Sequence, residues 1–243
     1  MTDFNYTKNM YNKYADIYIA KRKVRSKSFY NLYLSDYQLL KQLKPIIKNK
    51  MTLDIGCGDG TFTNELFKLG AKIQGVDISE KLIEYAKQHY KKINFNVVNA
   101  SKLNFNNRSF DIVVSNLMIH YFKELKPLFN EISRVLKPGG IFLFSFHHPF
   151  NEVLELHTNG KKTKVFIMPY FHEDEYFWEM EGMKMKSYHH TFTEVSKKLK
   201  ESSFYIEEIE ESQAPRSSIK LDKEMYNFSN KYPTFCIIKA VKK

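Results

Sequence analysis

Long apolar runs and cysteine are scarce in this sequence, and each scarcity excludes a class of protein. No stretch approaches the roughly 18 apolar residues needed to cross a bilayer. The polar segment 1–18 also lacks the apolar core of a signal peptide. Cys57 and Cys236 are too few and too isolated for a disulfide framework or a zinc site. We therefore expect no membrane partner, no bound metal and a cytoplasmic location.

Acidic residues are scarce at the start of the chain. Residues 1–50 contain 11 Lys and Arg against 3 Asp and Glu, and they carry most of the formal net charge of +11 at pH 7. The excess gathers around the run AKRKVRSK, which leaves tRNA open as a partner. A compositional bias toward lysine, or a solvated face, explains the same run without nucleic acid.

Apolar residues make up 43% of the 243 positions and aromatic residues 15%, enough for a sizeable core. From about residue 50 to residue 200, strand-like and helix-like periods alternate, which is typical of a parallel sheet covered by helices. Ser79 is placed to cap the second of these helices, and Pro138 with two glycines to stop the third. Strands are predicted at 51–56, 72–78, 94–100, 110–117 and 141–147, with helices at 61–70, 79–92 and 123–140.

The pattern changes after Pro149, where short alternating runs and a turn at Asn159-Gly160 predict a β-rich insertion. Beyond it the sequence predicts a helix, a strand, a short helix and a last strand that pairs antiparallel at the sheet edge. We expect one α/β domain over 1–243, with a seven-stranded, mostly parallel sheet, helices on both faces and an antiparallel final strand. Its parts are an N-terminal helical lid (1–49), a ligand-binding core (50–149), a cap insertion (150–191) and the rest of the sheet (192–243).

The segment LDIGCGDG, residues 53–60, follows a predicted strand and precedes a predicted helix. Glycines in that position let the backbone approach a ligand at the helix N-terminus. The Gly-Lys-Ser/Thr ending of a phosphate-binding loop is missing after Gly60. Asp77 ends the next strand and suits a ribose, while Asp54 and Asp59 add negative charge beside the loop. The residues indicate a cationic nucleoside, although a plain glycine-rich turn explains the glycines alone.

With these residues the chain resembles the class I, seven-stranded S-adenosylmethionine-dependent methyltransferases of the small-molecule type. The matching segments LDIGCGDG, GVDIS, NASKLNF, SFDIVVSNLMIHYF and LKPGGIFLFSFHHPF occur in the family's order and spacing. The resemblance covers residues 50–150 strongly and the terminal strands moderately. It implies S-adenosyl-L-methionine as cofactor and S-adenosyl-L-homocysteine as product.

The resemblance also assigns the cofactor-binding residues. It brings Gly56, Cys57, Gly58 and Gly60 close to the methionine part of the cofactor. Asp54 would hold the amino group of that part, directly or through water.

On the nucleoside side, Asp77 would accept hydrogen bonds from both ribose hydroxyls, and Ile78 and Leu103 would enclose the adenine. The Asp-Ala pair usual at the adenine edge is Asn99-Ala100 here, so we expect cofactor binding weaker by about 1 kcal/mol.

Ser115 and Asn116 end the fourth predicted strand. The resemblance implies that they shape the floor beneath the transferring methyl group, with Ser115 among the cofactor-binding residues. Local hydrogen bonds at the strand end explain them equally well.

Histidines concentrate where the methyl acceptor is expected, with six of the eight between residues 147 and 190. Some family members have Ser-x-Glu-His-Pro and Tyr-His-Arg-Thr where this chain reads SFHHPF and YHHTF. By that resemblance His148 and His189 are the candidate catalytic residues, while His147 replaces a glutamate and His190 an arginine. The candidate acceptor-binding residues are Tyr30, His147, His148, Trp178, His189 and His190.

Each of these histidines could instead serve structure alone, and no carboxylate or cysteine completes a recognisable metal site among them. A sulfonium is already activated, so alignment and exclusion of water are the main requirements, and a base is needed only if the acceptor arrives protonated. Aromatic residues on both flanks would either pack the cap or line a pocket for a flat acceptor or an amine.

The sequence leaves three alternative functions. The leading one is methyl transfer to an O or N atom of a small-molecule acceptor by a monomer or homodimer. The others are a tRNA methyltransferase that uses the basic N-terminal segment, and an S-adenosylmethionine-binding protein without transfer activity.

Overall fold

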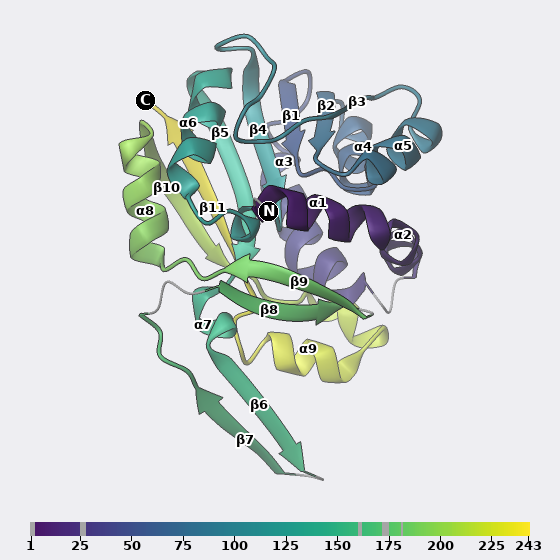
Figure 1. Ribbon diagram of the computed structural model, residues 1–243, viewed down its shortest axis with the longest axis vertical. Helices are drawn as coiled ribbons and strands as arrows, with labels where there is room; N and C mark the ends of the chain where they lie inside the picture. Colours follow the sequence, from purple (N-terminus) through teal and green to yellow (C-terminus); the bar gives the residue numbers. More distant parts are fainter. Residues whose placement is uncertain (1–2, 25–27, 160–161, 172–174, 181) are drawn as a thin grey trace.

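A seven-stranded sheet forms the centre of the computed structural model, which describes residues 3–24, 28–159, 162–171, 175–180 and 182–243 (Figure 1). The strand order is β10-β11-β5-β4-β1-β2-β3. β11 runs opposite to the other six strands of this sheet, which are parallel to one another, and this confirms the predicted fold. The strands are β1 (Met51–Ile55), β2 (Lys72–Asp77), β3 (Asn94–Val97), β4 (Phe110–Asn116), β5 (Leu136–His147), β10 (Phe204–Glu211) and β11 (Phe235–Lys242).

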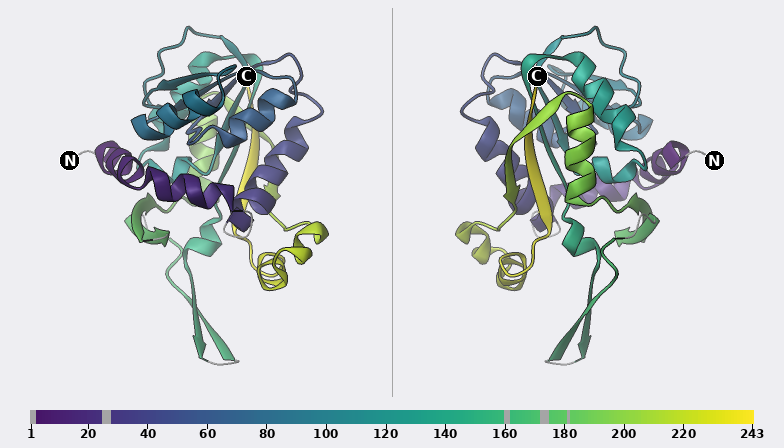
Figure 2. Two further views of the ribbon diagram at one scale, coloured as in Figure 1. Left: turned by 90° about the vertical axis from the view of Figure 1, so that its right-hand side faces the viewer. Right: turned by 90° about the vertical axis from the view of Figure 1, so that its left-hand side faces the viewer.

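Helices cover both faces of the sheet (Figure 2). Alternate residues of β4 supply the two cores, with Val113 on one face and Ile112 and Val114 on the other. Ser79 caps its helix as predicted, since its Oγ accepts a hydrogen bond from the Leu82 amide. One face carries α3 (Tyr37–Leu43), α4 (Thr61–Lys68) and α5 (Glu80–His89), and the other carries α6 (Leu125–Val135) and α8 (Phe192–Glu201).

The third core helix is shorter than its predicted extent of 123–140. It ends at Val135, and β5 begins at once with Leu136. Gly139 has a φ of +72°, and a Cβ added to Gly140 would lie 2.8 Å from the Lys137 carbonyl oxygen. The Pro-Gly-Gly segment therefore shapes the tight start of the strand, and the helix ends before it is reached.

Two N-terminal helices, α1 (Asp3–Lys13) and α2 (Ala15–Lys23), cross the carboxyl end of the sheet (Figure 1). α1 packs against α5 and the hairpin strand β9. A π-helical segment, η2 (Tyr30–Asp36), then leads into α3.

The β-rich insertion is confirmed as two hairpins that follow the short helix α7 (Pro149–Glu152). Strands β6 (Leu154–Asn159) and β7 (Lys162–Ile167) reach away from the body, and β8 (Glu175–Met180) and β9 (Met183–Tyr188) lie along α1 (Figures 1 and 2). Gly160 of the predicted turn lies outside the described residues. Between β10 and β11 stand η4 (Arg216–Lys220) and α9 (Lys223–Ser229).

None of the helices described is both long enough and apolar enough to span a bilayer.

Candidate active site

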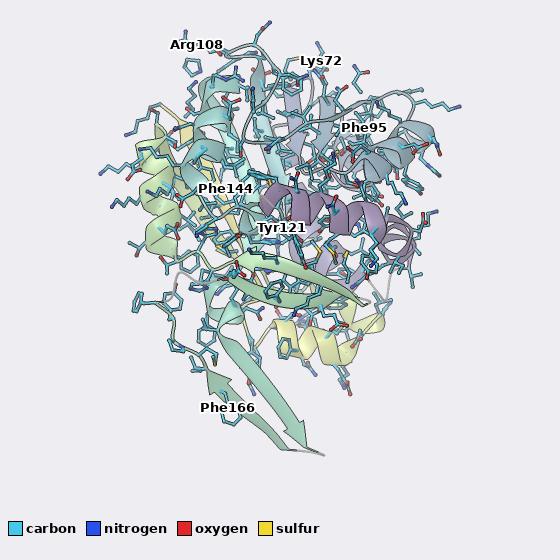
Figure 3. The ribbon with its side chains drawn as sticks, viewed as in Figure 1. Lys72, Phe95, Arg108, Tyr121, Phe144 and Phe166 are labelled. Carbon is cyan, nitrogen blue, oxygen red and sulfur yellow. The ribbon has the colours of Figure 1, made fainter. Side chains whose placement is uncertain are left out.

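A cavity of about 650 Å³ opens at the carboxyl ends of β1, β2, β4 and β5. The N-terminal helices and strand β8 complete its walls. Figure 3 places Tyr121, one of its lining residues, beside α1. The sequence-predicted site residues that line it are Tyr30, Asp54, Gly56, Cys57, Gly58, Asp77, Ile78, Asn99, Ala100, His147 and Trp178.

The glycine loop leaves β1 with three positive φ values, +73° at Gly56, +55° at Gly58 and +79° at Gly60. A Cβ on Gly56 would lie 2.6 Å from Met118 Cγ, and one on Gly58 would lie 3.2 Å from Tyr18 Oη. Both of these neighbours line the cavity, whereas Gly60 itself does not. A Cβ on Gly60 would lie within 3.0 Å of Phe95, Ala86 and Tyr90, so its left-handed φ and internal packing both require glycine there.

Asp54 presents a buried carboxylate to the cavity. Its Oδ2 accepts a hydrogen bond of 2.6 Å from Thr63 Oγ1, while Oδ1 has no partner among the described residues. Burial raises the pKa of Asp54 to about 7. A desolvated oxygen without a donor is suited to a bound cation, such as an ammonium group.

Asp77 is held rigidly at the end of β2. Its Oδ2 accepts from the Gly58 amide and its Oδ1 from the Ser79 amide, each at 2.9 Å. Burial raises the pKa of this carboxyl group. Each oxygen keeps a further lone pair, so the fixed carboxylate can still accept hydrogen bonds from a ribose.

The adenine end of the predicted site is less complete. Asn99 Oδ1 accepts a 2.9 Å hydrogen bond from the Ser101 amide, which fixes the side-chain oxygen at the cavity wall. Leu103 is buried in the core and does not line the cavity, and its amide donates to Glu131.

Arg22 is a lining residue that the sequence interpretation assigned to a surface run. Its guanidinium donates a 3.0 Å hydrogen bond to Asp36 Oδ2, and its side chain is only 7% exposed. Its Nε and Nη1 have no partner among the described residues. Ala15 and Ile19 are buried on the same helix, and the spacing 15, 19, 22 marks Arg22 as part of that inward face.

Asp36 connects Arg22 to the end of the sheet. Its Oδ1 accepts a 2.6 Å hydrogen bond from Asn116 Nδ2, and Asn116 Oδ1 accepts from Ser145 Oγ at 2.8 Å. This buried network fixes α2 and η2 against β4 and β5. The next residue, Leu117, has a φ of +54° and lines the cavity.

His147 begins a second polar chain, at the end of β5. Its Nδ1 lies 2.8 Å from the Tyr176 hydroxyl, which donates a 2.7 Å hydrogen bond to Glu152 Oε1. The other oxygen, Glu152 Oε2, lies 2.6 Å from His189 Nδ1. His147, Tyr176 and Glu152 line the cavity. His189 does not line it and is connected to it through its contact with Glu152.

His120, which the sequence interpretation did not single out, stacks on His147 with ring centroids 3.9 Å apart. Neither ring nitrogen of His120 has a partner among the described residues. Burial lowers the pKa of His147 to about 4 and that of His120 well below its usual range. Both rings are therefore neutral at pH 7, and they present hydrogen-bonding groups without charge.

The remaining predicted acceptor residues lie away from the cavity lining. His148 Nδ1 accepts from the Phe150 amide and caps α7, and its Nε2 lies 2.8 Å from Glu211. His190 Nε2 lies 2.8 Å from the Phe122 carbonyl oxygen. Ser115, which was predicted to bind the cofactor, is also absent from the cavity lining; it is fully buried, and its Oγ has no partner among the described residues.

Aromatic side chains line much of the cavity. From the flanks considered in the sequence, Tyr14, Phe29, Tyr170 and Phe171 do not line it. Trp178 is fixed by a 2.9 Å hydrogen bond from its Nε1 to Ser187 Oγ. The aromatic lining residues are Phe4, Tyr11, Tyr18, Tyr30, Phe62, Tyr121, Phe122, Tyr176, Phe177, Trp178, Phe228 and Phe235.

Among the residues described, no group of three or more His, Cys, Asp or Glu side chains is arranged to hold a metal ion. His172, one of the clustered histidines, lies outside those residues.

Comparison with known proteins gives one consistent result. Residues 53–144 match the methyltransferase domain family. The ubiquinone biosynthesis O-methyltransferase of Pelagibacter ubique is 32% identical over 116 residues, which cover 46% of this chain and 48% of that protein. The protein of the same name from Coxiella burnetii is 33% identical over 103 residues, covering 41% and 44%. The chain thus spans about half the length of the curated relatives it matches.

A crystal structure of an S-adenosylmethionine-dependent methyltransferase from Mesorhizobium loti is similar to a larger part of this chain. It is 25% identical, covers 85% of this chain and 97% of its own, and superposes with a TM-score of 0.73. The matched domain shows that residues 53–144 form a methyltransferase domain, and the strand order and the glycine loop give the chain the fold of the class I S-adenosylmethionine-dependent methyltransferases.

Proposed function

We propose that the protein transfers a methyl group to an O or N atom of a small-molecule acceptor. The observation that carries this proposal is one cavity of about 650 Å³ that joins the glycine loop to an aromatic chamber. The volume is within the usual range for sites that enclose metabolites. In this proposal residues 1–243 act as one domain, with α1 and α2 as a lid and the β8–β9 hairpin as a cap.

The unpartnered groups of the cavity fit S-adenosylmethionine, which supplies a methyl group on a positively charged sulfur. Asp54 Oδ1 would accept from the ammonium group of the methionine part, and Arg22 Nε and Nη1 would donate to its carboxylate. Asp77 would hold the ribose, and Ile78, Asn99 and Ala100 the adenine. S-adenosylmethionine has no phosphate, so the missing phosphate-binding sequence after Gly60 is consistent with this ligand.

Methyl transfer then requires the protein to align an acceptor with the methyl group and to exclude water. The aromatic lining residues serve both requirements, because they offer flat apolar walls against which an acceptor can stack. Two of the relatives carry the name of ubiquinone biosynthesis O-methyltransferases, which supports an acceptor oxygen on a small molecule.

The basic N-terminal run supports a tRNA acceptor less well than its composition indicated. Arg22 is buried against Asp36, and Lys23 Nζ lies 5.2 Å from the centroid of the Tyr85 ring. Arg25 lies outside the described residues. We therefore consider a small molecule a better candidate for the acceptor than tRNA.

We further propose that the protein is a cytoplasmic monomer or homodimer. Both of its cysteines are free and buried.

Calorimetry with S-adenosylhomocysteine tests the cofactor site. Asp77→Asn should weaken binding at least tenfold, because hydrogen bonds to a charged acceptor contribute about 1.5–3 kcal/mol each. Asp111→Asn is the matched control, since Asp111 pairs with Lys137 and the Met51 amide outside the cavity.

Formation of S-adenosylhomocysteine in the presence of small phenols, small amines or bulk tRNA tests the acceptor class. Turnover of a small molecule supports the proposal. Turnover of tRNA alone would replace it with the tRNA function, and cofactor binding without any turnover would leave a binding protein.

A further inference from the structure

Resting on the proposed methyl transfer, we propose that the acceptor is a hydroxyl compound whose proton passes to His147 Nε2. Tyr176 and Glu152 act as positioning residues that orient the imidazole and take up the proton behind it. The juxtaposition that carries this inference is the buried chain from His147 through Tyr176 to Glu152 at the cavity wall.

The direction of the hydrogen bonds sets the tautomer of His147. A tyrosine hydroxyl has one proton, and that of Tyr176 is donated to Glu152 Oε1. The Tyr176 oxygen must therefore accept from His147 Nδ1–H, 2.8 Å away. A neutral imidazole with its proton on Nδ1 carries a lone pair on Nε2.

The surroundings of His147 hold its ring in place and keep it uncharged. His120 and Phe235 lie nearly parallel to it, at interplanar angles of 14° and 17°, and Trp178 meets it edge-on at a centroid distance of 5.6 Å. The His147 side chain is 17% exposed, while Glu152 is 3% exposed. A rigid base of this kind requires little reorganisation when an acceptor arrives.

The chamber favours a hydroxyl on a ring over an ammonium group. His120 and His147 carry no charge at pH 7, and both oxygens of Glu152 already take part in hydrogen bonds with Tyr176 and His189. An alcohol or phenol needs only one acceptor for its proton. His147 Nε2 provides that acceptor among aromatic walls.

The proposed step balances without any further reactant. The acceptor oxygen forms a bond to the methyl carbon as the carbon–sulfur bond breaks and its electron pair stays on sulfur. The hydroxyl proton moves to His147 Nε2, the Nδ1 proton moves to the Tyr176 oxygen, and the Tyr176 proton moves to Glu152. After the step His147 is neutral, with its proton on Nε2. Burial raises the pKa of Glu152, which makes this carboxylate a better proton acceptor.

Nitrogen-15 NMR of the histidine rings tests the orientation without any turnover. The wild-type His147 should show the Nδ1–H tautomer at pH 7. Tyr176→Phe should abolish that preference, whereas Tyr205→Phe, a change at an exposed tyrosine of β10, should preserve it. An Nε2–H tautomer in the wild type would overturn the proposal.

Turnover tests the acceptor class, with catechol and 3,4-dihydroxybenzoate compared with aniline and 2-phenylethylamine. We expect methylation of a hydroxyl compound, with kcat reduced about 100-fold or more in His147→Asn and Tyr176→Phe at unchanged affinity for S-adenosylhomocysteine. Methylation of amines alone, or full activity in His147→Asn, would overturn this inference and leave the proposed function standing. Turnover of neither class would contradict the proposed function itself.

Discussion

Asp54 shows how a single residue can be costly for stability and still suit function. Burial raises its pKa to about 7 in the folded chain, compared with about 3.9 in an unfolded one. The folded state therefore binds more protons than the unfolded state between these values, and stability falls as pH rises from about 4 to about 7. Asp77 and Asp36 add to the same effect through their negative charges.

Replacing Asp54 by Asn should therefore change stability and binding in opposite directions. At pH 7 we expect the free energy of unfolding to rise by up to a few kcal/mol, because a neutral amide avoids the burial of charge. Affinity for S-adenosylhomocysteine should fall at least tenfold, because the partner of the ammonium group is lost. Denaturant unfolding at pH 4 and pH 7, with calorimetry, measures both effects. Equal pH dependence in wild type and variant would contradict this account.

His148 shows the limit of sequence interpretation at the residue scale. His147 and His148 are adjacent at the end of a predicted strand, and such neighbours point to opposite sides. The register of β5 against β11, with His147 opposite Phe235, decides which of them faces the cavity. That pairing joins segments almost ninety residues apart, so local sequence could predict a histidine at the site without predicting which one.

His148→Ala should lower the free energy of unfolding by about 1 kcal/mol, the usual value of a helix N-cap. Its affinity for S-adenosylhomocysteine should match that of the wild type. Thermal or denaturant unfolding combined with calorimetry checks both points. Loss of turnover with unchanged stability would instead support the catalytic role predicted from the sequence.

At the scale of elements, the core strands and helices could be predicted because their periods are regular and their caps are local. The N-terminal helices could be predicted as helices, but their polar contacts could not. Arg22 was placed in a basic surface run because charge is visible in sequence and its partner Asp36, fourteen positions later, is not. The buried bonds among Arg22, Asp36 and Asn116 make α2 a wall of the site.

Arg22→Gln should weaken binding of S-adenosylhomocysteine at least tenfold and loosen the N-terminal helices, because Asp36 would be left as an unpaired buried charge. Hydrogen exchange over residues 3–24 should become faster in this variant. Lys23→Gln, a change at the neighbouring lysine, is the control and should alter neither property. Unchanged exchange and affinity in Arg22→Gln would show that α2 is not part of the cofactor site.

At the scale of the whole molecule, the fold brings the carboxyl edge of the sheet, the N-terminal helices and the β8–β9 hairpin together around one cavity. The β1–β5 core supplies Asp54, the glycine loop and Asp77, which the sequence could predict as a set. The elements that cover this edge supply Arg22, Tyr176 and Glu152, and the positions of these side chains depend on hydrogen bonds between different elements, 14 to 29 residues apart, that no local pattern predicts. The net positive charge of residues 1–50 is partly internal, since Arg22 faces the cavity.

A crystal structure with S-adenosylhomocysteine tests the central claim most directly. We predict the amino group at Asp54 Oδ1, the carboxylate at Arg22, the ribose at Asp77, and the sulfur facing the enclosed chamber that contains His120 and His147. Binding of the ligand outside this cavity, or a sulfur facing an open basic groove, would contradict the account of an enclosed small-molecule methyltransferase.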